Sequence, residues 1–383
     1  MIGSAGLLLI NLGTPDDPSV SSVRKYLKEF LSDPRVITLP FLLRYLLLYL
    51  FILPFRPARS AQYYREIWTD KGSPLLHFSQ SFTEKLQARL GNSYTVQLGM
   101  RYGKPSISDA LKALQHCDSL TILPLFPQYS SAATGSAIAL TLKLLAQYQT
   151  FPKQMTLIRE FYAHPAFINA QVIQIQPFIR PLSKLAATSE VRGDTERKTA
   201  VCTSVNEDAS SISTKQFADE VEFQKGSIAS HDFLLFSYHG LPTKQILCEH
   251  SIDCCKLQKD CPSISSENDT CYRAQCFATS ATIARTLGLT SMQYATAFQS
   301  RLGKLKWTQP YFEEFLEELY HRGIRRLAIA CPGFVADCLE TLEEIGIRAK
   351  KQWQQLGGEQ LTLIPALNDA EHWVDRIPEI FML

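Results

Sequence analysis

The sequence predicts an α/β protein with two similar doubly wound domains, each built on a parallel sheet, and a cleft between them. Short apolar runs that are typical of buried strands alternate with helical patterns along the chain. This alternation favours parallel sheets with right-handed crossovers. Four strands are expected in each half of the 383 residues, and a chain of this length exceeds one typical hydrophobic core.

The expected elements follow the same order in both halves. In the first half, strands are expected at residues 7–12, 94–98, 119–125 and 156–160, and helices at 19–31, 79–90, 106–116, 134–148 and 165–185. In the second half, strands are expected at 233–237, 292–298, 326–331 and 360–364, and helices at 273–287, 310–322 and 337–356.

These elements divide into three parts. Residues 1–164 are expected to form an N-terminal α/β domain and residues 165–345 a C-terminal α/β domain. The helix and strand within residues 346–383 are expected to pack back on the N-terminal domain. Residues 186–230 are dense in Ser, Thr, Glu, Asp and Lys and lack a hydrophobic period, which predicts a solvated insertion, passive rather than regulatory.

The composition excludes several classes of function. Hydrophobic residues make up 45% of the chain and charged residues 20%, as in an ordinary globular protein. The formal net charge is +2 and no Lys/Arg-rich run is present, so no nucleic-acid partner is expected. The N-terminus leads directly into the first strand without the pattern of a signal peptide, which predicts a cytoplasmic protein.

Residues 41–55 form the most apolar stretch of the chain. They are fewer than the roughly 18–20 apolar residues that a membrane span needs, and Arg44 interrupts them. Two interpretations are open. The stretch can be a buried helix, or it can lie in a membrane interface, because Tyr, Phe and Arg gather at its ends. The second interpretation predicts a peripheral protein on the inner face of the cytoplasmic membrane.

A second insertion is rich in cysteine. Six of the ten cysteines lie between residues 248 and 276. In a cytoplasmic protein structural disulfides are not expected, which leaves a metal ion or a redox cofactor to explain the clustering.

One histidine stands at the end of an expected strand. The apolar run from Phe233 leads to His239, and Gly240 and Pro242 then stop the strand. In open α/β sheets the ligand crevice lies outside the carboxyl ends of the strands. An imidazole there can bind a metal or move a proton near neutral pH. A single strand-end histidine is more often structural than functional, so the interpretation needs a partner for it.

Three acids supply that partner. Asp337, Glu340 and Glu344 follow the strand at 326–331 with the spacing i, i+3, i+7, which puts them on one face of the expected helix. The helix macrodipole favours acids near a helix N-terminus and explains one or two of them. The macrodipole explains three acids on one helix face less well.

Taken together, these motifs resemble the ferrochelatases of the bacterial type that uses protoporphyrin. The resemblance covers nearly the whole chain apart from residues 186–230 and 248–271. It rests on Asn11-Leu-Gly-Thr-Pro15, Gly99-Met-Arg-Tyr102, Pro124-Leu-Phe-Pro-Gln-Tyr129-Ser-Ser-Ala-Ala-Thr134-Gly-Ser136, Ser237-Tyr-His239-Gly-Leu-Pro242, Phe298-Gln-Ser-Arg301, Trp307, and the run from Cys331 to Glu344.

The resemblance implies a chelatase-like fold with a porphyrin cleft between the domains. It implies an enzyme, a lyase that inserts Fe²⁺ into protoporphyrin IX to form protohaem with release of two protons, the last step of haem biosynthesis, without a nucleotide. It also implies that His239 and Glu340 hold the iron and that Glu344 and Asp337 extend the row of acidic side chains from Glu340. Many relatives have a second histidine at the position of Cys338, so a two-histidine mechanism is not implied. Whether His239 acts first as ligand or as base stays open.

The resemblance further implies a porphyrin-binding surface. Leu12, Tyr102, Trp307 and Phe334 resemble family positions that line the cleft, although ordinary core packing would explain each of them. Relatives that use coproporphyrin commonly have tyrosine at the position of Leu12, so the leucine favours protoporphyrin IX. Residues 41–55 correspond to apolar lips in relatives, which favours membrane contact.

Some ferrochelatases carry a [2Fe–2S] cluster in an internal segment. The implied ligands here are Cys248, Cys255, Cys261 and Cys271, because such a cluster takes four thiolates. Cys254 is the alternative to its neighbour Cys255, and Cys276 is the expected non-ligand. Structural zinc is the rival occupant, since four cysteines also bind Zn²⁺.

Two other functions are left open. The first is a chelatase for another metal or tetrapyrrole, such as cobalt or coproporphyrin. The second is a non-catalytic protein that binds haem or iron. The presence of both His239 and Glu340 favours the enzyme. Nothing in the sequence indicates an oligomeric state.

Overall fold

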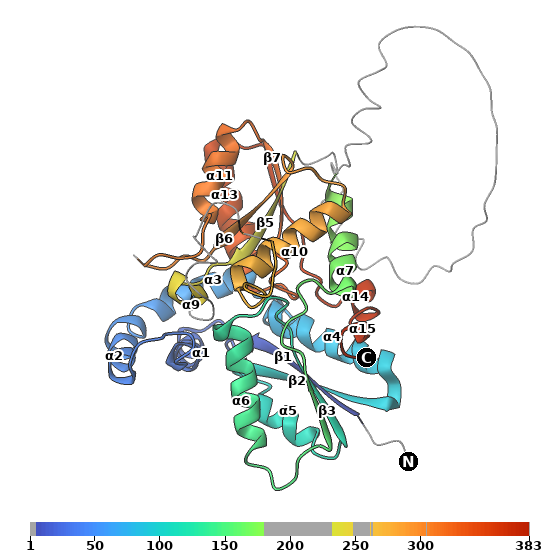
Figure 1. Cartoon of the computed structure of the whole chain (residues 1–383). Coiled ribbons are helices and arrows are strands. Elements are labelled where there is room, and N and C mark those ends of the chain that lie inside the picture. Colours follow the sequence, from blue (N-terminus) through green and yellow to red (C-terminus); the bar gives the residue numbers. More distant parts are fainter. Residues whose placement is uncertain (1–4, 180–231, 248–260, 262, 304, 383) are drawn as a thin grey trace, which may run out of the picture.

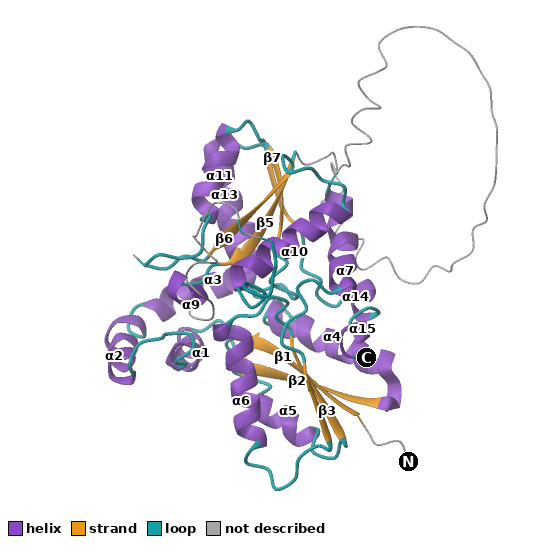
Figure 2. Cartoon of the chain, viewed as in Figure 1, coloured by secondary structure: helices purple, strands orange, loops and turns teal. Residues whose placement is uncertain are grey.

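The protein contains two parallel four-stranded sheets with helices around them (Figures 1 and 2). The computed structural model describes residues 5–179, 232–247, 261, 263–303 and 305–382. The strand orders are β2-β1-β3-β4 and β6-β5-β7-β8, and every pairing is parallel. The predicted α/β class with two similar sheets is confirmed. The predicted insertion at residues 186–230 lies outside the described residues.

The first sheet is covered by helices on both faces. The apolar run in its central strand is wholly buried: Leu7 and Leu9 pack against the α4 side chains, and Leu8 and Ile10 pack against α5 and α6. The main elements of this half are β1 (Ala5–Gly13), α1 (Val20–Ser32), α2 (Phe41–Leu46), η1 (Leu47–Ile52), α3 (Arg56–Ile67), α4 (Pro74–Leu90), β2 (Tyr94–Tyr102), α5 (Ile107–Ala113), β3 (Ser119–Pro124), η3 (Ser131–Gly135), α6 (Ser136–Leu145), β4 (Gln154–Leu157) and α7 (Pro165–Ile175).

The second sheet repeats this plan. Leu234 and Phe236 pack on the side of α10, whereas Phe233 and Leu235 pack on the side of α11 and α13. The main elements of this half are β5 (Phe233–His239), α9 (Thr243–Leu247), α10 (Tyr272–Thr286), β6 (Tyr294–Gln299), α11 (Phe312–His321), β7 (Arg326–Ala330), α12 (Leu339–Thr341), η8 (Leu342–Ala349), α13 (Lys350–Leu356), β8 (Gln360–Leu363), α14 (Glu371–Val374) and α15 (Pro378–Phe381).

The C-terminal segment differs from its prediction. The helix and strand expected to pack on the N-terminal domain remain in the second half, because β8 pairs with β7 and Trp353 of α13 packs in the same core as β5. Within residues 346–383, contacts with the first half come from the last two short helices, from the loop before them, and from Arg348, whose guanidinium lies over the ring of Tyr63. Trp373 of α14 joins a core cluster that contains side chains of both sheets, and Lys85 of α4 forms ion pairs with Asp369 and Glu371.

The apolar stretch at residues 41–55 is not a buried helix. It forms α2 and the π-helical turn η1, and Phe41, Phe51 and Phe55 are 73%, 65% and 74% exposed. In the part of the chain that the structure describes, no single helix is long and apolar enough to span a membrane. The bent pair Phe41–Ile52 and Arg56–Ile67, with an angle of 67°, passes that test by length and composition alone.

The packing of the C-terminal helices yields a prediction on stability. Trp373 is 1% exposed, and its ring centroid lies 6.1 Å from that of Phe82 and 6.1 Å from that of Phe167. Trp373→Ala should therefore lower the free energy of unfolding by about 3–5 kcal/mol, measured by urea denaturation. Met292→Ala, at an apolar side chain that is 71% exposed, is the control and should change it by less than about 0.5 kcal/mol. Equal effects of the two substitutions would contradict this packing.

Candidate active site between the two sheets

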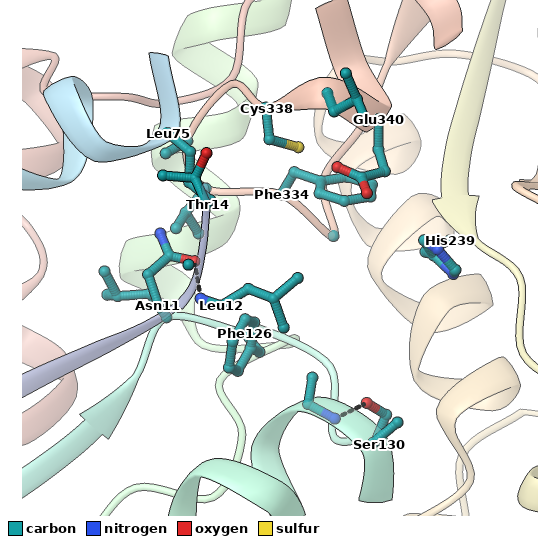
Figure 3. A pocket seen from close by; sticks show the side chains of 18 of the residues that line it. Asn11, Leu12, Thr14, Leu75, Phe126, Ser130, His239, Phe334, Cys338 and Glu340 are labelled. Atoms are coloured by element: carbon teal, nitrogen blue, oxygen red, sulfur yellow. Dashed lines mark hydrogen bonds between the residues drawn. The ribbon is translucent and has the colours of Figure 1, made fainter. Parts of the chain in front are cut away.

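A pocket lies where the carboxyl ends of the two sheets face each other (Figure 3). Leu12 of β1 and Phe126 after β3 line it from the first half, and His239 of β5, Phe334 and Glu340 line it from the second half. The free space in and around it, including the open solvent at its mouth, is about 1070 Å³. The strand-end crevice that the sequence predicts is therefore present.

His239 is the last residue of β5 and is half-buried. Its Nδ1 lies 2.6 Å from the carbonyl oxygen of Gly240. A carbonyl oxygen can only accept a hydrogen bond, so Nδ1 carries a proton, and Nε2 has a free lone pair whenever the imidazole is neutral. Gly240 must be glycine at this position, because a Cβ there would lie 2.9 Å from the carbonyl oxygen of Gln299. The imidazole is thus oriented by the chain immediately after it.

Glu340 lies on α12, a single helical turn that follows β7. The Cys338 side chain caps this turn, and the Thr341 hydroxyl accepts a hydrogen bond from the Cys338 N–H at 3.0 Å. The backbone carbonyl of Glu340 accepts from Nε2 of Gln299 at 2.7 Å. The backbone is therefore fixed while the carboxylate lines the pocket, as His239 does from β5 (Figure 3).

Asp337 does not share the helix face that its spacing predicts, because the helix begins only at Leu339 and Asp337 precedes the cap. Its carboxylate is buried and accepts hydrogen bonds from Thr341 at 2.8 Å, from Asn368 at 2.8 Å and from the Ala366 N–H at 3.2 Å. Burial raises the pKa of Asp337, and these donors oppose the shift. Asp337 is not among the side chains that line the pocket.

Glu344 lies one turn beyond Glu340, on the π-helical segment η8. Its carboxylate accepts from the backbone N–H of Ser300 at 2.8 Å and from the Ser300 hydroxyl at 2.6 Å. Burial raises the pKa of Glu344, and the bonds from Ser300, the positive charge of Arg348 and the charge of His239 when it is protonated oppose the shift. Glu344 stands behind the pocket wall and influences His239 and Glu340 through its charge.

The four residues expected to contact a porphyrin are placed differently. Leu12 and Phe334 line the pocket. Tyr102 is fully buried, and its hydroxyl donates to Asp33 at 3.0 Å. Trp307 is half-buried and packs over Gly240, with its Nε1 donating to the carbonyl of Leu302 at 2.9 Å. Tyr102 and Trp307 thus border the site without forming its wall.

Several residues of the site escape the sequence analysis. Tyr26 of α1 and Tyr64 of α3 line the pocket, and burial raises the pKa of both phenols well above the ordinary value, so both stay neutral. Arg56 at the start of α3 is a cation whose pKa burial lowers, while the charge of Glu340 opposes that shift. Helical periodicity marks such positions only as core-facing, so it contains no signal for their contact with a ligand.

The cysteines proposed as cluster ligands are only partly described. Cys271 is buried and packs with Ile246 and Ala274, and Cys261 packs against the same small cluster. Cys248 and Cys255 lie outside the described residues. Over the residues with described positions, no group of three or more His, Cys, Asp or Glu side chains is arranged to bind a metal ion.

Comparisons with known proteins agree with this geometry. A family model described as Ferrochelatase matches residues 4–191 and 205–382, and its gap falls inside the polar insertion. A ferrochelatase of Legionella pneumophila is 47% identical over 376 residues, covering 98% of this chain and 98% of the relative. A ferrochelatase of Coxiella burnetii is 46% identical over 380 residues, covering 98% of this chain and 92% of the relative.

Among solved structures, SirB from Bacillus subtilis with Fe³⁺ aligns with a TM-score of 0.47 and 10% identity, over 98% of this chain and 95% of that chain. The two sequence relatives and the family model, each spanning nearly the whole chain, confirm the resemblance drawn from the motifs. The chain belongs to the ferrochelatase family of metal chelatases.

Proposed function

We propose that this chain inserts Fe²⁺ into protoporphyrin IX in the pocket between the two sheets and forms protohaem with release of two protons. The observation that supports this best is that His239 at the end of β5 and Glu340 on α12, which follows β7, line a single apolar pocket. Membership of the ferrochelatase family supports the same reaction. Both iron and porphyrin are substrates, and the chemistry needs no nucleotide.

The two polar side chains supply what metal insertion requires. The reaction removes two protons from ring nitrogens while the cation exchanges water for nitrogen ligands. In the neutral imidazole, Nε2 of His239 has a free lone pair and can accept a proton or bind the cation. The Glu340 carboxylate suits a divalent cation and can also carry a proton away. The apolar walls exclude water, which strengthens both interactions.

The apolar walls have a second role, which is to bend the macrocycle. A nitrogen lone pair must turn toward the incoming cation, and a distortion of this kind takes ~1–5 kcal/mol from binding energy elsewhere on the ligand. Leu12, Phe126 and Phe334 offer apolar surface from both halves. Leu12 also favours protoporphyrin IX over coproporphyrin, because an aliphatic side chain has no polar group to pair with the additional carboxylates.

Removal of the imidazole should abolish turnover without loss of the fold. His239→Ala should lower kcat about 10²–10⁴-fold, in an anaerobic assay with Fe²⁺ and protoporphyrin IX that follows the shift of the Soret band. The KM for the porphyrin should change little, because the walls remain. His321→Ala, at the end of α11, is the control and should keep wild-type kinetics. Turnover by His239→Ala near the wild-type rate would favour a haem-binding protein instead.

The proposal includes contact with a membrane surface, on the inner face of the cytoplasmic membrane. Phe41, Phe51 and Phe55 expose large apolar surfaces, and Leu302 and Leu305 do so from the loop after β6. Exposed large apolar side chains that gather in one segment are typical of a surface that binds a membrane or a partner.

Both exposed segments border the same part of the molecule. Gln245 of α9 donates to the carbonyl of Val36, just before α2, at 3.2 Å. Pro242, just before α9, pairs with Trp307 at the end of the loop. Figure 1 has α2 and α9 on the same side of the protein. A poorly soluble porphyrin can then pass from the bilayer into the pocket.

The membrane proposal predicts a loss of vesicle binding. The triple variant Phe41→Ser/Phe51→Ser/Phe55→Ser should bind vesicles of phosphatidylethanolamine and phosphatidylglycerol at least about tenfold more weakly, since each buried phenyl ring contributes about 1.5–3 kcal/mol. Sedimentation with the vesicles measures this. The control is Phe151→Ser/Met292→Ser, at exposed apolar residues elsewhere (58% and 71%). Equal binding by the triple variant and the wild type would exclude this surface.

The proposal also includes a [2Fe–2S] cluster, with zinc as the rival occupant. Cys261 and Cys271 share one small apolar cluster. Burial raises the pKa of the neighbouring Cys276 thiol, and the charges of Cys271 and Cys261 raise it further. A pair of close thiols fits part of a four-thiolate site, whose other ligands would be Cys248 and Cys255. When bound, a cluster supplies a cross-link and one-electron redox chemistry.

The cluster is tested by spectroscopy. Anaerobically purified protein should absorb in the visible range and contain two iron atoms and two sulfides per chain, the definition of such a cluster. Cys271→Ser should remove this absorbance. Cys117→Ser, at a buried cysteine in the first half, should keep it and serves as the control. A colourless wild-type sample that holds zinc would identify the rival site.

A further inference from the structure

Two residues with a strained backbone, Ser300 and Asn368, bind the carboxylates of Glu344 and Asp337. Throughout the described part of the chain, Ser300 (φ 66°) and Asn368 (φ 48°) are the only non-glycine residues with a left-handed backbone. This conformation is unfavourable for residues with a Cβ, least so for asparagine. Such strain persists only where surrounding contacts impose it. Both residues contact an acid next to the pocket.

Ser300 binds both oxygens of one carboxylate. Its backbone N–H donates to Oε1 of Glu344 at 2.8 Å, and its hydroxyl donates to Oε2 at 2.6 Å. Hydrogen bonds to an ionised acceptor are the strong ones. Because the two donors belong to a single residue at the end of β6, they fix the position and the rotation of the carboxylate together.

Asn368 binds one carboxylate oxygen and the backbone N–H of Asp337. Its Nδ2 donates to Oδ2 of Asp337 at 2.8 Å, and its Oδ1 accepts from the Asp337 N–H at 2.8 Å. Thr341 donates to the other carboxylate oxygen at 2.8 Å. Asp337 is thus fully engaged in holding the turn before α12.

Glu340, the middle acid, is held differently. Its backbone carbonyl is fixed by Gln299 at 2.7 Å, whereas its carboxylate lines the pocket. The Cys338 thiol lies within hydrogen-bonding reach of that carboxylate and is a weak donor. The carboxylates of Asp337 and Glu344 are therefore fixed by hydrogen bonds, whereas the carboxylate of Glu340 can exchange partners.

The bond from Ser300 keeps the Glu344 carboxylate from pairing with a nearby cation, Arg348. Its guanidinium forms two hydrogen bonds with Glu343, at 2.8 and 3.1 Å, and its Nη2 lies 4.0 Å from Oε2 of Glu344. Without the Ser300 hydroxyl, Glu344 can turn toward this guanidinium and form a closed ion pair. The charges that face Glu344 are then His239 from β5, Glu340 on the same helix, and Arg348.

We propose that Ser300 is a positioning residue that keeps the negative charge of Glu344 directed at the iron site and away from Arg348. This inference rests on the proposed function, because it assigns Glu344 to the attraction of Fe²⁺ rather than to the porphyrin. Glu344 supplies a fixed charge behind the pocket wall, and Glu340 supplies the mobile ligand.

Two substitutions of Ser300 distinguish the positioning of Glu344 from a purely structural role of Ser300. Ser300→Ala and Ser300→Gly both remove the hydroxyl, but glycine also relieves the strain at φ 66°. Both variants should raise the KM for Fe²⁺ about tenfold, the effect of one lost bond to a charged group, and leave the KM for protoporphyrin unchanged. The glycine variant should unfold at a urea concentration at least as high as the alanine variant.

Two further variants complete the design. Arg348→Gln alone should leave both KM values near wild type, and in Ser300→Ala/Arg348→Gln it should restore most of the lost affinity for Fe²⁺, because the competing cation is gone. Ser19→Ala removes the hydroxyl that caps α1. It is the control, with a lower urea midpoint and an unchanged KM for Fe²⁺.

The outcomes are distinct. If the wild type inserts iron and both Ser300 variants keep its KM for Fe²⁺, the positioning role is wrong and the proposed function stands. The role is also wrong if Ser300→Ala/Arg348→Gln shows no recovery. If the wild type itself inserts no iron, the proposed function is wrong and this inference is wrong with it.

Discussion

The geometry of the site depends on one buried side chain, the amide of Gln299 at the end of β6. Its Oε1 accepts from the Ser237 hydroxyl of β5 at 2.6 Å, and its Nε2 donates to the Glu340 carbonyl at 2.7 Å. Its backbone carbonyl also accepts from the Gly240 N–H at 2.8 Å. Leaving a buried amide without a partner costs about 1–3 kcal/mol, so the folded protein keeps these hydrogen bonds. The segments that bear His239 and Glu340 are therefore joined before any ligand binds.

The same low-dielectric surroundings determine which groups near the pocket are charged. Tyr26 and Tyr64 stay neutral because burial raises their pKa values. Burial also raises the pKa of Glu344, and the donors of Ser300 counteract this. Arg56 offsets part of the negative charge of Glu340 from the side of α3. A buried carboxylate is tolerated only with such partners, so each acid here has a donor or a cation assigned to it.

The sequence predicts the sheets better than the loops between them. Apolar runs mark most of the strands, although the largely exposed β4 lies at Gln154–Leu157 rather than at 156–160. The register of β5 and β6 brings His239 beside Gln299. The spacing rule fails at Asp337, because the cap at Cys338 starts the helix later and periodicity carries no information on caps. It also leaves residues 41–55 undecided, since a helix that is apolar on every face has the same pattern in a core and at a surface. The motifs place Tyr102 and Trp307 near the site. Whether such a side chain lines the pocket depends on contacts such as the bond from Tyr102 to Asp33.

The helix α3 connects the exposed apolar segment with the acids. It follows η1 directly, and its Tyr64 packs in the same cluster as Leu48 of η1 and Leu339 of α12. The guanidinium of Arg348 lies 5.5 Å from the ring of Tyr63, also on α3. Under the proposed membrane contact, a ligand that enters beside the apolar segment would meet the side chains of α3 before it reaches Glu340. A substrate with low solubility in water would gain most from such a path, because its apolar faces would stay covered on the way from the membrane surface to the proposed iron site.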